Sequence, residues 1–205
     1  MNTRTPVVLS LALVLLLFGT KLLVAEPLVA EKAPDFTLTD TNGVSHTLSD
    51  FQGRYVVLEW VNYDCPFVRK HYKSGNMQDL QKEYTQRKVV WLSICSSAEG
   101  KQGQFSNEEI KNRMDEYDAS PTHYLNDLDG SVGRLYQAKT TPHMFIINPE
   151  GILVYQGAID NHPFFWEKGL FDATNYIREA LDYAMNGQSV AVTNTKSYGC
   201  SVKYK

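Results

Sequence analysis

The feature that most constrains the fold is a pair of apolar runs separated by a stretch with helical periodicity. The runs are YVVLEWV (residues 55–61) and KVVWLSIC (88–95), each of a length that suits a strand buried on both faces of a sheet. Between them, residues 66–87 place apolar side chains mostly at helical spacing, and Pro66 suits a first helical turn. Gly75-Asn76 predicts a break in this helix. The order predicts a parallel β-α-β unit with a right-handed crossover.

The flanking segments predict how this unit is extended. Asn42-Gly43 suits the turn of a hairpin between two short strands, and residues 148–151 (NPEG) suit a turn between two more. Ser106 and Glu109 form a capping box for another helix, and residues 172–187 read as a final amphipathic helix. We therefore predict an α/β fold, in which helices flank a central mixed sheet with an N-terminal hairpin and a C-terminal tail.

The N-terminal residues differ in character from the rest of the chain. Arg4 precedes an apolar, uncharged run, and small residues follow at Ala25 and Ala30, as in a secretory signal peptide. An uncleaved membrane anchor is the alternative, because only Lys21 interrupts the apolar stretch 7–25. The predicted organisation is a signal peptide or anchor (1–25), a linker (26–33), one domain (34–187) and a tail (188–205).

Charge and cysteine content narrow the classes of function. The 205-residue chain has a formal net charge of −3 and no basic run, which argues against nucleic acid as a partner. Three cysteines, at positions 65, 95 and 200, allow one disulfide and leave one thiol over. Thiols tend to be oxidised outside the cytoplasm, and an odd count is more typical of a working thiol than of a stapled scaffold.

No other cluster in the sequence indicates a second site. The five histidines lack metal-ligand spacing, and we predict neither a metal nor an organic cofactor. Residues 126–130 (NDLDG) lack the later ligands of a calcium loop, so a helix cap headed by Asp129 explains them better. The aromatic run HPFFW (162–166) is predicted to fill part of the core, with a partner-binding lip as the alternative.

Cys65 lies where the first apolar run gives way to the helical stretch. Unpaired N–H groups and the dipole at a helix N-terminus favour a thiolate, and Arg69 and Lys70 follow one turn on. Open α/β sheets also place their sites at the carboxyl ends of strands. The pattern favours a reactive thiol over a buried structural cysteine. A dithiol motif would put a second cysteine at position 68, which is Val68.

Glu59 and Pro142 are the next candidates. Glu59 is a carboxylate inside an apolar strand, where burial would raise its pKa and allow it to act as a proton relay for Cys65. The alternative is an edge or solvent-facing position, or pairing with Lys70 or Lys139. Pro142 precedes an apolar run, where either a cis or an ordinary trans proline fits.

Three segments resemble the thioredoxin-fold redoxin superfamily, namely the AhpC/TSA peroxiredoxins and their thioredoxin-like relatives. They are APDFTLTDTNGVSHTLSDFQGRYVVLEWV (33–61), NYDCPFVRKHY (62–72) and DLDGSVGRLYQAKTTPHMFIINPEGILVYQG (127–157). The resemblance implies a thioredoxin-like fold, a cis Pro142 beside a Thr141 that faces Cys65, and Glu59 at the position of the buried aspartate of thioredoxins. With SYGCSVKY in the tail, the chain looks most like the peroxiredoxin-like subgroup that keeps only the first cysteine of the dithiol.

The chain also departs from that family. Typical peroxiredoxins carry Pro seven residues, and Thr or Ser three residues, before the reactive cysteine, where this chain has Leu58 and Asn62. The amide of Asn62 is a candidate replacement for the hydroxyl that orients peroxide. Arg69 and Arg134 are the candidate arginines beside the thiol. These departures leave peroxide reduction and thiol–disulfide exchange as rival reactions.

Cys200 is a candidate partner for Cys65. It follows Gly199 in what reads as a flexible tail, so it could reach a thiol on the domain and resolve it as a disulfide. Cys95 is the rival, because it ends a neighbouring strand and would share a sheet edge with Cys65; otherwise it is an inert buried thiol. Connectivity does not follow from sequence alone.

Together these features predict an exported thiol oxidoreductase of peroxiredoxin-like type. The Cys65 thiolate would attack a peroxide or a disulfide, and Cys200 or an outside thiol would resolve the product. Thr141 and Pro142 would shape the site, and an external thiol protein would supply reducing equivalents. The alternative from another class is a non-enzymatic module that senses redox state or binds a partner.

Overall fold

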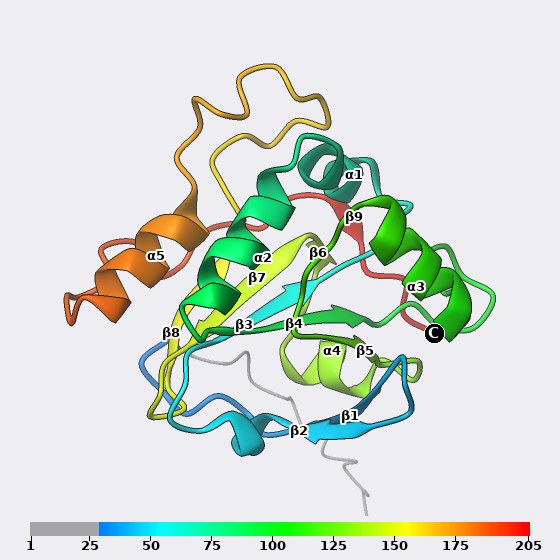
Figure 1. Cartoon of the computed structure of the whole chain (residues 1–205), viewed down its shortest axis with the longest axis horizontal. Helices are drawn as coiled ribbons and strands as arrows, with labels where there is room; N and C mark the ends of the chain where they lie inside the picture. The colour runs from blue at the N-terminus through cyan, green and yellow to red at the C-terminus, as the bar shows by residue number, and fades with distance from the viewer. Residues whose placement is uncertain (1–28) are drawn as a thin grey trace, which may run out of the picture.

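The computed structural model describes residues 29–205, so the predicted signal peptide or anchor (1–25) lies outside the described residues. Seven strands form one mixed sheet in the order β2-β1-β5-β4-β3-β7-β8 (Figure 1). Its strands are β1 (Thr37–Asp40), β2 (Ser45–Thr47), β3 (Val56–Trp60), β4 (Val90–Cys95), β5 (His123–Asn126), β7 (His143–Ile147) and β8 (Leu153–Gly157). A second, two-stranded sheet consists of β6 (Thr140–Thr141) and β9 (Cys200–Ser201).

Five α-helices and one 3-10 helix are described within residues 29–205. They are η1 (Leu48–Phe51), α1 (Pro66–Lys73), α2 (Asn76–Gln86), α3 (Asn107–Glu116), α4 (Ser131–Leu135) and α5 (Tyr176–Met185). None of them has the length and apolarity needed to span a bilayer.

The centre of the sheet is the parallel unit that the two apolar runs predict. Strands β3, β4 and β5 are parallel neighbours. On the other side of β3, β7 pairs antiparallel with β3, and β8 pairs antiparallel with β7. The predicted helix break is present: α1 ends before Gly75, whose φ of +82° suits glycine, and α2 begins after it. These elements bring the carboxyl end of β3 and the start of α1 to one edge of the sheet.

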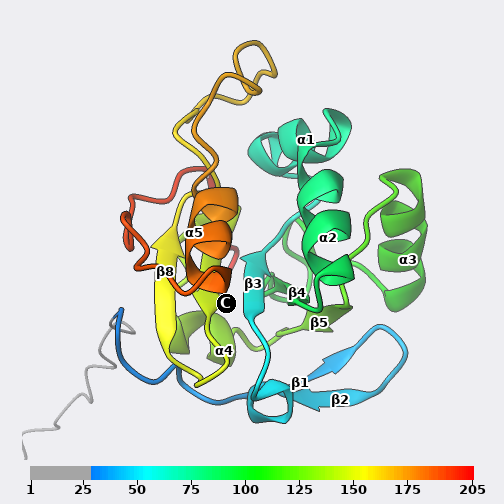
Figure 2. The same ribbon diagram turned by 60° about the vertical axis from the view of Figure 1, so that its left-hand side comes forward.

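Each face of the sheet is covered by its own core. Helices α1, α2, α3 and α5 pack on one face, while α4, η1 and the N-terminal segment pack on the other (Figures 1 and 2). Buried side chains of the first core include Val57, Trp91, Met144, Met77, Leu80, Ile110 and Ile177. Those of the second include Leu58, Leu92, Phe145, Phe36, Phe51, Val132 and Tyr136. Burial on both faces explains why β3 and β4 read as continuous apolar runs.

Three expectations are corrected by the structure. Gly130, with φ of +70°, is the N-cap of α4 in place of Asp129, whose carboxylate accepts the Ser131 N–H at 2.8 Å. The predicted core plug is wrong, because Phe165 and Trp166 are 59% and 46% exposed. They lie on the segment between β8 and α5 that projects beside α1 in both views (Figures 1 and 2).

The C-terminal tail is the third correction, since it is bonded to the domain along its length. The N–H of Gln156 donates to Thr193, and the N–H of Val202 donates to Lys139 at 3.1 Å. Between these contacts, β9 pairs antiparallel with β6 below α1 (Figure 1). The tail therefore crosses the sheet edge where β3 leads into α1.

Candidate functional site

Cys65 is the N-cap residue of α1 and is fully buried. Its N–H donates to the Asn62 carbonyl at 2.9 Å, which closes the turn between β3 and the helix. Its thiol donates to the Thr141 carbonyl at 3.1 Å, and the Thr141–Pro142 peptide bond is cis. Thr141 thus lies against the cysteine, as the resemblance implies.

Cys200 lies directly opposite Thr141 in the antiparallel pair of β6 and β9. Residues paired in this way have Cα atoms about 4.5–5.5 Å apart, so Cys200 lies beside the carbonyl that binds the Cys65 thiol. Burial, a hydrogen bond with Cys65 and the nearby Cys65 charge raise the pKa of Cys200 to about 12. The Cys200 thiol is therefore protonated at neutral pH.

Cys95 has different neighbours. Its thiol donates to the Gly103 carbonyl at 3.3 Å, and burial raises its pKa. Ser97 and Tyr124 are its other polar contacts. These contacts fit the inert buried thiol. Of the other two cysteines, the described contacts join only Cys200 to Cys65.

Gly199 allows β9 to approach the site closely. Its φ is +137°, and a Cβ atom there would lie 2.1 Å from the Thr141 carbonyl oxygen. Only glycine fits so close to another backbone. The glycine beside Cys200 therefore allows the two strands to pair.

Tyr198, two residues before Cys200, fixes the tail on the domain. Its hydroxyl donates to Asp160 and accepts from Lys70 at 3.2 Å, while His71 lies 3.2 Å away. Burial lowers the pKa of Lys70 to about 8 and that of His71 well below its ordinary value. Sequence patterns did not indicate this cluster, because its members come from α1, the loop after β8 and the tail.

Glu59 is fully buried in the middle of β3. Its carboxylate accepts four hydrogen bonds, from Tyr72 at 2.9 Å, Trp91 at 2.8 Å, Ser93 at 3.0 Å and Gln81 at 3.1 Å. Burial raises its pKa, although these four donors act in the opposite direction. The alternatives of an edge position or a lysine partner are therefore wrong, and the proton-relay role stays a prediction.

Comparison with known proteins gives the family. The protein-family model of the AhpC/TSA family matches residues 29–156. The chain belongs to the AhpC/TSA family. Among curated relatives, the thiol-disulfide oxidoreductase ResA of Bacillus subtilis (strain 168) is 30% identical over 122 residues, which are 60% of this chain and 63% of ResA. The thioredoxin-like protein YneN of the same organism is 28% identical over 123 residues, 60% of this chain and 67% of YneN.

Solved structures agree on the fold. An uncharacterized conserved protein from Geobacillus kaustophilus is 27% identical with a TM-score of 0.73, covering 86% of this chain and 92% of its own. The thioredoxin domain of a thiol-disulfide oxidoreductase from Bacteroides vulgatus is 21% identical with a TM-score of 0.50, over 63% of this chain and 87% of its own. The predicted thioredoxin-like fold is confirmed, and this AhpC/TSA member has thiol-disulfide oxidoreductases as relatives.

Asn62, the residue in the family's Thr or Ser position, is used to shape the loop. Its side-chain oxygen accepts the Asp64 N–H at 2.9 Å, and its NH2 group donates to the Gln102 carbonyl at 3.2 Å. The described bonds of Arg134 are to the Asp129 and Lys205 carbonyls. A peroxide-orienting role for Asn62 stays a prediction, and no described contact joins Arg134 to Cys65.

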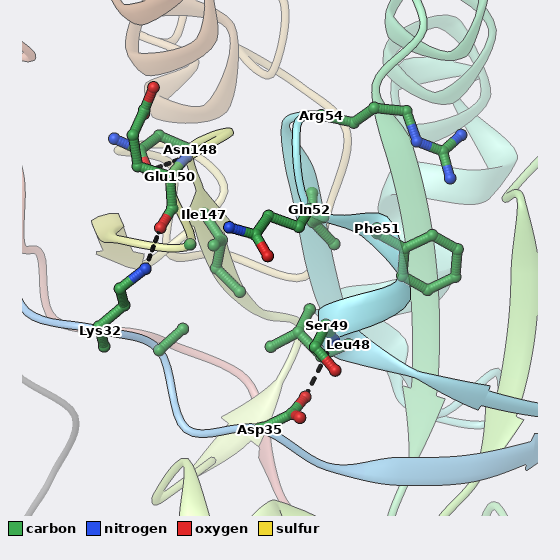
Figure 3. A pocket seen from close by; sticks show the side chains of 13 residues that line it. Lys32, Asp35, Leu48, Ser49, Phe51, Gln52, Arg54, Ile147, Asn148 and Glu150 are labelled. Carbon is green, nitrogen blue, oxygen red and sulfur yellow. Dashed lines mark hydrogen bonds between the residues drawn. The ribbon is translucent and has the colours of Figure 1, made fainter.

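A separate pocket lies at the opposite end of β3 (Figure 3). Its lining includes Val56, where β3 begins, and Ile147, where β7 ends, whereas Cys65 follows the other end of β3. Asp35 and Ser49 are hydrogen bonded on one wall, and Lys32 and Glu150 on another. Its 13 lining residues include no cysteine and no histidine, so the pocket has no part in the thiol chemistry.

The raised pKa of Glu59 predicts a pH dependence of stability. A carboxyl that holds its proton more tightly when folded stabilises the protein below its ordinary pKa of 4.5, and this stabilisation is lost as the pH rises through the folded-state pKa. Between the two values the free energy of unfolding should fall by about 1.4 kcal/mol per pH unit. Denaturant unfolding across this range, compared with Glu59→Gln, should show that slope in the parent protein alone. If the free energies of unfolding of the two proteins change with pH in parallel, the raised pKa of the buried Glu59 is contradicted.

Proposed function

We propose that the protein is a thiol–disulfide oxidoreductase whose redox pair is Cys65 and Cys200. The observation that carries this proposal is the pairing of β9 with β6. It places Cys200 opposite Thr141, whose carbonyl binds the Cys65 thiol. The second cysteine that a local dithiol motif would supply at position 68 thus comes from the tail.

In the first step, Cys65 attacks a substrate disulfide. The Cys65 sulfur bonds to one substrate sulfur, and the other substrate sulfur leaves as a thiolate. The N-terminus of α1 stabilises the attacking thiolate through its N–H groups and dipole. Because Cys65 is fully buried, β9 must move away from β6 to admit a disulfide on a protein.

In the second step, Cys200 resolves the mixed disulfide. Its proton passes to the substrate thiolate released in the first step. The Cys200 sulfur then attacks the Cys65 sulfur and releases the remaining substrate thiolate, so that two electrons pass to the substrate and a Cys65–Cys200 disulfide forms. The raised pKa of Cys200 keeps it protonated until this step. An external dithiol protein then reduces the pair and restores the enzyme.

An exposed aromatic loop favours a protein as the substrate. Phe165 and Trp166 are exposed, and the Phe165 ring lies 6.3 Å from Phe67, two residues after Cys65. Aromatic side chains dominate contact energies where they are buried at an interface. A folded or unfolded polypeptide could bury this loop while its disulfide meets Cys65, whereas a peroxide is too small to use it.

Peroxide reduction is the second candidate, because the family model that matches the chain is that of AhpC/TSA proteins. In that reaction the Cys65 thiolate would attack the O–O bond to give a sulfenic acid, and Cys200 would displace water to form the same disulfide. We further propose that the protein acts outside the cytoplasm, on the strength of the signal-like residues 1–25.

Rapid-mixing kinetics of the reduced protein test the proposal. Insulin disulfides should oxidise Cys65 faster than they oxidise free cysteine, and hydrogen peroxide should react at the rate of a free thiol. Phe165→Ser should slow the reaction with insulin about tenfold, since a lost aromatic contact costs roughly 1.4 kcal/mol, and leave the peroxide reaction unchanged. Val44→Ser, which alters another exposed apolar residue, is the control.

Two other outcomes would contradict the proposal. A fast reaction with peroxide that disappears in Cys65→Ser would make the protein a peroxidase. If neither insulin nor hydrogen peroxide reacts with the protein faster than with a free thiol, the proposed enzymatic activity is contradicted. That result would favour a module that senses redox state or binds a partner.

A further inference from the structure

Three polar side chains meet on a part of the sheet remote from the cysteines in sequence. Asp40 ends β1, His46 lies in β2 and His123 begins β5. Because β1 lies between β2 and β5, strands far apart in the sequence bring these groups together. One ligand atom from each lies within 4.8 Å of the other two.

The Asp40 carboxylate is held in a fixed orientation. Its Oδ1 atom accepts the N–H groups of Asn42 at 2.8 Å and Val44 at 3.0 Å within the hairpin turn. Its Oδ2 atom faces the histidines, 3.0 Å from His46 Nε2 and 3.7 Å from His123 Nδ1. Only 7% of this side chain is exposed, so the carboxylate cannot turn freely toward water.

A hydrogen bond to Asp40 explains the position of His46 but not that of His123. His46 bonds to Asp40, but 3.7 Å is too long for a hydrogen bond from His123. The His123 ring nevertheless stacks on His46, with centroids 3.8 Å apart and planes at 28°, and directs Nδ1 to the same oxygen. The two imidazole side chains are 15% and 27% exposed, so an ion from solvent can reach them.

We propose that Asp40, His46 and His123 form a binding site for a divalent transition-metal ion of the zinc type. Imidazole nitrogen and carboxylate oxygen are ligands that zinc accepts. Bonds of 2.0–2.2 Å in tetrahedral geometry put ligand atoms about 3.3–3.5 Å apart. The two separations between the carboxylate and the imidazoles, 3.0 and 3.7 Å, bracket this value, and all three ligand atoms lie within 4.8 Å of one another. Water takes the fourth position.

Such an ion would join the β1–β2 hairpin to β5. All three ligands come together only in the folded chain, since His123 is far from the hairpin in sequence. An ion that binds the folded state alone raises the melting temperature, and the rise grows with the logarithm of the free ion concentration once that exceeds the Kd. The site is independent of the thiol chemistry proposed for Cys65 and Cys200.

Calorimetric titration with zinc chloride tests the site. The background is the full chain with Cys65→Ser and Cys200→Ser, because thiolates also bind zinc. One ion should bind, and His123→Ala and Asp40→Asn should each weaken binding by about tenfold or more, as loss of even an outer-shell partner does. Asp40→Asn keeps Oδ1 for the turn, and His162→Ala, a histidine outside the cluster, should leave the affinity unchanged.

Thermal melts provide the second readout. Zinc should raise the melting temperature of the parent background and leave that of His123→Ala unmoved, each compared with the same protein without zinc. Absence of zinc binding to the parent, or equal affinity in His123→Ala, Asp40→Asn and the parent, would overturn the site. If Asp40→Asn fails to fold, His123→Ala decides the question, because no described hydrogen bond joins the His123 ring to the cluster.

Discussion

Cys65→Ser lowers the rate of disulfide reduction by on the order of a thousandfold or more, to the background of the buffer. Serine is a far weaker nucleophile than a cysteine thiolate at neutral pH, and removal of a catalytic nucleophile alone abolishes most of the rate enhancement. The substitution is nearly isosteric, and the hydroxyl can still donate to the Thr141 carbonyl that the thiol contacts. Insulin reduction with a dithiol as the reductant measures the loss.

Variants of the other two cysteines show which step of the reaction each cysteine takes part in. Cys95→Ser should keep the rate within about twofold. The serine hydroxyl can still bond to the Gly103 carbonyl, and substitutions at a site that does not contact Cys65 have little effect on it. Cys200→Ser should leave the first step intact and accumulate the Cys65–substrate mixed disulfide, which mass spectrometry detects. If Cys200→Ser turns over at the parental rate without an adduct, Cys200 is not the resolving cysteine.

Gly199→Ala separates the tail from the site. The new Cβ atom would meet the Thr141 carbonyl oxygen at 2.1 Å and its carbon at 2.8 Å, both backbone atoms that cannot rotate away. β9 must therefore leave β6, and Cys200 leaves Cys65 with it. We expect Cys65–Cys200 disulfide formation to slow by about tenfold or more, because the effective concentration of the second thiol falls.

Alkylation provides the complementary measurement for Gly199→Ala. Cys65 is fully buried and bonded to Thr141, with which β9 pairs, so displacement of β9 should increase the rate of reaction of Cys65 with N-ethylmaleimide. Gly100→Ala is the matched control, because Gly100 has a φ of +73° and a methyl group there would meet none of the described atoms within 4 Å. It carries the same kind of backbone strain without the clash. Equal alkylation rates in the two variants would show that β9 does not cover Cys65.

The sequence alone predicted those parts of the protein that depend on neighbouring residues. The apolar runs at 55–61 and 88–95, with helical spacing between them, predicted the parallel unit because strand and helix periodicities are local properties. The same reasoning placed Cys65 at the start of a helix and the helix break at Gly75. The exposed Phe165 and Trp166 show its limit, because apolar character does not say which side chains find a partner to cover them.

Tertiary structure alone decided which residues meet. Thr141 lies 76 positions from Cys65, and Cys200 reaches the pair only because β9 joins β6. The four donors around Glu59 come from α1, α2 and β4, and His46 meets His123 through the order of the strands. Contacts of this kind depend on strand order and register, which arise from packing of the whole chain and not from the pattern of any one segment.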